Sequence, residues 1–148
     1  MFDALNKYKI HDHFFLTATG SLEEVCNAPD DKDGVYIIYE LKNGHVTMIY
    51  VGTSEAHSIG YSKDSLFGLK QAILKGVPVE NEPRSQSWPV KMLSENIDAL
   101  DIYWYVTYKG NLRDHPIDLQ SRLLISYMRI YGEVPPWNKH VKSRKKPR

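Results

Sequence analysis

The sequence has one cysteine, Cys26, among its 148 residues. A single thiol excludes an internal disulfide and a thiolate-rich zinc site, and the six histidines show no HxxxH or HExxH spacing. We therefore expect oxygen atoms to supply most ligands of any bound metal. Long apolar runs are also missing, since none approaches the roughly 18 residues of a membrane span, and the first residues lack the basic and apolar regions of a signal peptide. We expect a cytoplasmic protein without a membrane partner.

Charge of one sign is concentrated at the C-terminal end. Residues 139–148 carry six basic side chains and no acidic one, so residues 1–138 carry −5 within a chain of net charge +1. Such a segment either neutralises nucleic-acid phosphates or is a solvated terminus, and the sequence leaves both interpretations open. We expect a basic tail at 139–148, a domain at 34–138, and an N-terminal extension at 1–33 that packs on this domain.

The chain is long enough for one domain with its own core, and its hydrophobic content of 42% is typical of globular proteins. Patterns of β-branched and aromatic residues predict strands, and apolar residues at helical spacing predict helices. The resulting order, β-β-α-α-β-α, predicts an α+β domain with a small three-stranded antiparallel sheet flanked by helices. The strands are expected at 34–39, 46–51 and 101–108, and the helices at 64–75, at 89–97 with proline in the first turn, and at 116–131 before Gly132.

The first two strands are framed by Gly34-Val35-Tyr36 and Tyr50-Val51-Gly52. A two-residue turn at Asn43-Gly44 would place Tyr36 opposite Val51 and send the two tyrosines to opposite faces. A three-residue turn at 42–44 would instead pair Tyr36 with Tyr50 and Gly34 with Gly52. We predict the second register, in which two phenols share one face and the paired glycines leave the backbone open to a ligand.

These two tripeptides resemble the halves of the GIY-YIG nuclease motif. The later segments Gln120-x-x-Leu-Leu-x-x-Tyr127 and Pro135-Pro-Trp-Asn138 resemble the last helix and terminal loop of that superfamily, and the likeness spans about residues 33–140. It implies a GIY-YIG-like fold and hydrolysis of DNA phosphodiesters with one divalent cation, Mg or Mn.

The resemblance also implies roles for individual residues. Tyr36 would lie at the attacking water with Tyr50 beside it, Asn138 would be a polar positioning residue, and Gly34 and Gly52 would form the motif backbone. A hard cation prefers a carboxylate oxygen, and charge on the phosphoryl group is stabilised by a guanidinium or a metal.

Both charged catalytic positions depart from the pattern. Gln120 stands where the superfamily has its metal-binding glutamate, and it is the residue expected at the metal. On the first helix, Lys70 or Ala72 stands where an arginine is expected, and lysine provides charge without a guanidinium fork. Further contacts to nucleic acid are expected from basic side chains on loops and in the tail: Lys63, Arg84, Lys142, Arg144, Lys145 and Lys146.

Three interpretations follow from these departures. The chain is a DNA endonuclease of GIY-YIG lineage that is impaired because glutamine was introduced for glutamate, or a natural pseudonuclease that binds nucleic acid. In the third interpretation, the fold serves protein recognition. The missing arginine favours natural loss of activity, whereas the shape of glutamine, so close to that of glutamate, suits either recent loss or deliberate replacement.

Overall fold

The computed structural model describes residues 2–56, 66–77 and 79–139. Its centre is an antiparallel sheet of four long strands in the order β1-β4-β2-β3, and the short strand β5 pairs with the end of β4. The α+β class is confirmed, but the expectation of three strands is wrong, because residues before Asp33 add the edge strand β1. In chain order, the elements are η1 (Asp3–Lys7), β1 (His11–Leu16), α1 (Leu22–Val25), β2 (Asp33–Lys42), β3 (His45–Thr53), α2 (Leu69–Lys75), α3 (Arg84–Ser94), β4 (Ala99–Lys109), β5 (Leu112–Arg113) and α4 (Pro116–Tyr131).

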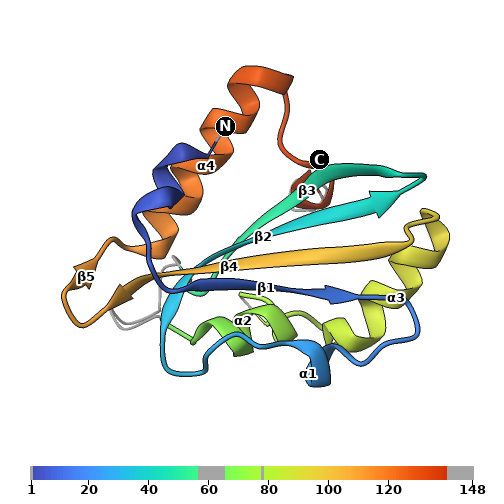
Figure 1. Cartoon of the computed structure of the whole chain (residues 1–148), viewed down its shortest axis with the longest axis horizontal. Helices are drawn as coiled ribbons and strands as arrows, with labels where there is room; N and C mark the ends of the chain where they lie inside the picture. Colours follow the sequence, from blue (N-terminus) through green and yellow to red (C-terminus); the bar gives the residue numbers. More distant parts are fainter. Residues whose placement is uncertain (1, 57–65, 78, 140–148) are drawn as a thin grey trace, which may run out of the picture.

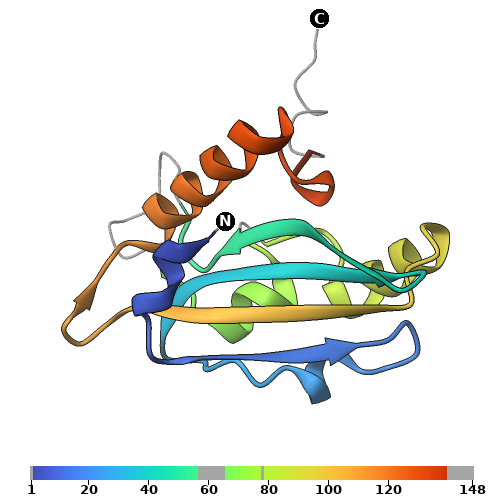
Figure 2. The same ribbon diagram turned by 45° about the horizontal axis from the view of Figure 1, so that its top comes forward.

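Helices lie on both faces of the sheet (Figures 1 and 2). The face toward α1, α2 and α3 is called the inner face here, and the face toward η1 and α4 is called the outer face. Side chains alternate along β4, so Ile102 and Trp104 point inward while Tyr103 and Tyr105 point outward. Each face therefore has its own hydrophobic cluster. Within the described ranges, no helix is long and apolar enough to cross a membrane.

The hairpin register differs from the predicted one. The turn is the two-residue Asn43-Gly44, with Lys42 paired to His45. A bulge then shifts the pairing, because Tyr39 pairs with Met48 while Ile38 pairs with Tyr50. Tyr36 consequently faces Gly52 and not Tyr50. A two-residue turn alone would place Tyr36 and Tyr50 on opposite faces, and the extra residue of the bulge returns them to the same face.

Two of the predicted helices begin elsewhere. The helix expected at 64–75 begins at Leu69 within the described residues, after Gly68 adopts φ +84 and donates its N–H to Asp33. The helix expected at 89–97 occupies Arg84–Ser94 and contains Pro89 internally. Pro89 is the sixth residue of this helix, so the prediction that it lies in the first turn is wrong.

The last helix matches its prediction. Pro116 starts α4, where a missing N–H costs no hydrogen bond, and Gly132 ends it in the left-handed conformation. Leu119, Leu123 and Tyr127 recur every four residues and bury one stripe against the outer face.

Candidate functional site

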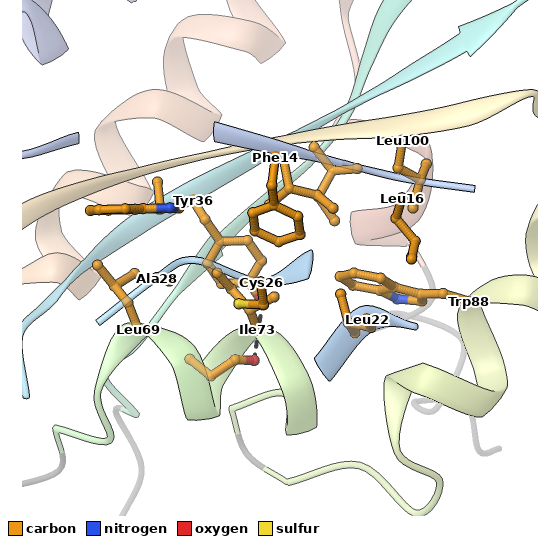
Figure 3. Packing of buried hydrophobic residues seen from close by; sticks show 14 of the residues in the cluster. Phe14, Leu16, Leu22, Cys26, Ala28, Tyr36, Leu69, Ile73, Trp88 and Leu100 are labelled. Carbon is orange, nitrogen blue, oxygen red and sulfur yellow. Dashed lines mark hydrogen bonds between the residues drawn. The ribbon is translucent and has the colours of Figure 1, made fainter. Parts of the chain in front are cut away.

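Tyr36 and Tyr50 lie on the inner face of the sheet, as predicted. Their ring centroids are 5.9 Å apart, and Tyr36 is fully buried between the sheet and α2. Figure 3 shows Tyr36 within this layer, together with Phe14, Ile73 and Trp88. The Tyr36 hydroxyl donates to the backbone carbonyl of Ala72 on α2. One of the two phenols therefore has no route to solvent.

The two motif glycines do not face each other. Gly34 pairs with Val106 on β4, and Gly52 lies opposite Tyr36. A Cβ at Gly52 would overlap the Tyr36 ring, and one at Gly34 would overlap the backbone carbonyl of Tyr105. The space left by Gly52 is thus filled by a phenol of the same chain, and the predicted ligand approach over paired glycines is wrong.

A buried guanidinium joins the two tyrosines. Arg84, the first residue of α3, is 2% exposed, and its Nη1 donates to the Tyr36 hydroxyl at 2.5 Å. Nη2 contacts the Tyr50 hydroxyl at 3.4 Å and the Glu80 carboxylate at 2.9 Å. The carbonyls of Ala72 and Ile73 also accept from Nη1, at 3.1 and 3.2 Å. We call Tyr36, Tyr50, Glu80 and Arg84 the tyrosine-arginine cluster.

Burial sets the protonation of this cluster. It raises the pKa of Tyr36 far above the usual range of a phenol, although the charge of Arg84 opposes the shift. Burial alone would lower the pKa of Arg84, but the phenols and Glu80 outweigh it and raise that pKa. Near neutral pH the cluster therefore holds a neutral phenol and a charged guanidinium paired with Glu80.

Gln120 and Asn138 meet at the edge of β3 that does not pair with β2. Val51 donates its N–H to the Asn138 side-chain oxygen at 3.0 Å, and its carbonyl accepts from the Asn138 amide at 3.1 Å. The Gln120 amide donates to the same carbonyl at 3.1 Å. Both side chains thus satisfy backbone groups that an edge strand leaves unpaired.

The residues present do not suit the divalent cation that the resemblance implies. The Gln120 amide nitrogen faces Val51, and its oxygen is a neutral ligand without charge to hold a hard cation. Glu80 supplies a carboxylate, but both of its oxygens bond to Arg84. Within residues 2–56, 66–77 and 79–139, no group of three His, Cys, Asp or Glu side chains has the geometry of a metal site.

Of the basic residues singled out in the sequence, the structure describes Lys70 and Arg84. Lys70 on α2 interacts electrostatically with Cys26. Burial raises the pKa of the Cys26 thiol, and the positive charge of Lys70 opposes this shift. Arg84 was expected on a loop facing nucleic acid, but it begins a helix and its side chain points inward. Lys63, Lys142, Arg144, Lys145 and Lys146 lie outside the described residues.

The contact of Arg84 with the tyrosines was not predicted from the sequence, and Glu80 was not among the predicted site residues. The ion pair joins residues four apart, but Glu80 precedes α3, so their spacing did not predict a helical contact between them. The contact with the tyrosines had no local signal either, because 48 residues separate Tyr36 from Arg84. Comparison of the chain with family models, curated proteins and solved structures found no match to any of them.

Proposed function

We propose that this chain is a nucleic-acid-binding domain of GIY-YIG-like lineage that does not cleave DNA at an appreciable rate. The basic segment after Asn138 contacts phosphates, and the tyrosine-arginine cluster stabilises the fold. The proposal combines the resemblance in the sequence with the tertiary contacts of the matching residues. The observation that carries it is that the side chains of Tyr36, Gln120 and Asn138 already form hydrogen bonds within the chain itself.

Access and charge both oppose cleavage at these residues. A phosphate cannot reach Tyr36 or Arg84 without displacing Trp88 or α2, because both side chains are buried. The Arg84 guanidinium already bonds Glu80, two phenols and two backbone carbonyls, so a phosphate would have to replace these partners. Gln120 and Asn138 reach the edge of β3 from α4 and from the segment after it, and neither side chain bonds to the cluster.

The charge of the basic segment and the place where it begins both favour binding to phosphates. Residues 139–148 carry +6, and Asn138 fixes the start of that segment to Val51, next to Tyr50 on β3. Contacts between lysines and phosphates give affinity that is independent of base sequence and falls with salt.

The binding is tested by changing charge in matched pairs. Lys145→Gln/Lys146→Gln should weaken binding to unrelated duplexes by similar factors and reduce the slope of log K against log salt by up to about 1.8. The control is Lys75→Gln/Lys109→Gln, which removes the same charge from two exposed positions of the folded domain. Fluorescence anisotropy with a labelled duplex measures both. Absence of binding by the intact chain at low salt would overturn the proposal and favour protein recognition.

The absence of cleavage is tested at Gln120. Gln120→Glu should not produce nicking of supercoiled DNA in Mg²⁺ or Mn²⁺, because the new carboxylate would lie against the Val51 carbonyl and away from the buried cluster. Gln120→Met is the control of similar length without an amide. If Gln120→Glu gained metal-dependent cleavage that Tyr36→Phe abolished, the chain would be an impaired nuclease instead.

A further inference from the structure

The outer face of the sheet carries a group of aromatic side chains that takes no part in the tyrosine-arginine cluster. They come from three neighbouring strands, where outward positions alternate with buried ones. We call this group the outer aromatic face; it consists of His11, His13 and Phe15 on β1, Tyr103 and Tyr105 on β4, and Tyr39 on β2.

The rings of this face are ordered against one another. His13 stacks on Tyr103 with centroids 4.6 Å apart and planes 10° apart, and His11 stacks on Tyr105 at 5.6 Å. Tyr39 meets the edge of Tyr103 at 5.5 Å. Such contacts hold the rings in fixed orientations before any ligand arrives, which lowers the entropy lost on binding.

Part of this face is open to solvent. Figure 2 shows η1 and α4 over one side of the sheet, and Tyr39 and Tyr105 pack at the border of the cluster beneath them. Farther along β1, Phe15 is 52% exposed and the His13 side chain 39% exposed. A phenyl ring that gains so little from burial is available to another planar group.

An acidic residue on this face contacts a histidine. Asp101 lies among the rings, but the His13 Nδ1 is 2.8 Å from its carboxylate. This contact requires hydrogen on Nδ1 and leaves Nε2 as the free polar atom of the ring. His11 is exposed, and the exposed Lys9 precedes it by two residues.

We infer that the outer aromatic face binds single-stranded nucleic acid by stacking bases on Phe15 and its neighbouring rings. Aromatic rings on a sheet or groove accept bases of any sequence, because every base has a π-face. A base on Phe15 would lie beside His13, whose Nε2 can bond to the base edge. The inference rests on the proposed function, but it concerns a different surface and a different form of nucleic acid.

The test is anisotropy with the full chain and labelled 12-mers of single-stranded DNA, single-stranded RNA and duplex DNA. Phe15→Ala should weaken single-strand binding roughly 5- to 150-fold, the usual range for one stacked base, and leave duplex binding unchanged. Phe15→Tyr should retain the affinity, whereas Phe15→Leu should not, because only tyrosine keeps the ring. Tyr131→Ala is the matched control, since Tyr131 is 56% exposed on α4.

The outcomes separate this inference from the proposed function. If the intact chain binds duplexes through its tail but Phe15→Ala binds single strands as tightly as the parent does, only the stacking surface is refuted. If the intact chain binds no nucleic acid, both are refuted. A loss of self-association in Phe15→Ala, measured by sedimentation, together with unchanged single-strand affinity, would assign the face to a second copy of the chain.

Discussion

Replacing Arg84 by methionine separates a structural role of the tyrosine-arginine cluster from a catalytic one. Methionine has a similar length and keeps most of the apolar contact with Trp88, but it lacks every donor. The change leaves Glu80 without its ion-pair partner and removes one hydrogen-bond donor from the Ile73 carbonyl and one from the Ala72 carbonyl, which still accepts from the Gly76 N–H and the Tyr36 hydroxyl. The Tyr50 and Tyr36 hydroxyls lose the same guanidinium.

The magnitude follows from the burial of these partners. Removing one member of a buried ion pair typically costs about 3–5 kcal/mol, because the partner is left uncompensated. Glu80 is 36% exposed and can turn to water, which reduces its share. The phenols and carbonyls are less exposed, and each unsatisfied group costs about 1–3 kcal/mol. We expect Arg84→Met to lower the free energy of unfolding by about 3–4 kcal/mol.

Urea unfolding followed by far-UV circular dichroism measures this loss. Arg129→Met, on the exposed side of α4, is the matched control and should change stability by less than about 0.5 kcal/mol. Arg84→Lys should fall between the two, because lysine keeps the charge but not the planar fork. If Arg84→Met were as stable as the control, the cluster would not support the fold, and its burial would need another explanation.

Two further changes test other parts of the structure. Gly52→Ala should cost about 1–3 kcal/mol because its Cβ overlaps the Tyr36 ring, and combining it with Tyr36→Leu should cost less than the sum of the two single changes; additive costs in urea unfolding would argue against this contact. The hydrogen bond from Tyr8, with help from Lys7, holds the pKa of Asp114 below its usual value. The ionised Asp114 carboxylate therefore contributes to the free energy of unfolding above pH about 4, and this contribution is lost as the pH falls below that value. Asp114→Asn should be less stable than the parent at pH 7 and nearly equal to it at pH 2, and an equal gap at both pH values would contradict this assignment.

The sequence was sufficient for elements whose signals are local. The spacing of Leu119, Leu123 and Tyr127, with Pro116 before them and Gly132 after them, defines α4 without reference to the rest of the chain. Strand β1 was missed because its outward positions are filled by His11, His13 and Phe15, so the sequence does not alternate between polar and apolar residues. Its partner, β4, lies about 90 residues away along the chain.

The hairpin shows how a correct conclusion can rest on an incorrect step. The shared face of Tyr36 and Tyr50 was predicted from a three-residue turn, whereas the chain uses a two-residue turn and a bulge. A shorter turn moves Tyr36 and Tyr50 to opposite faces, and the extra residue of the bulge moves them back, so the two changes cancel. The face that the two tyrosines share is therefore the same in both registers, but the residue opposite Tyr36 is not. In the structure Tyr36 packs over Gly52, and its phenol lies toward α2 and Arg84.

The same distinction applies to the candidate site. A sequence motif records which residue types occur in which order, but it does not record which atoms satisfy their hydrogen bonds. Gln120 and Asn138 match in order, yet both bond to the backbone of Val51. Arg84 was expected to contact nucleic acid, yet it supplies the guanidinium that contacts both tyrosines. Whether such a group acts on a substrate or on its own fold depends on whether water can reach it, and at Arg84 the burial of the side chain favours the fold.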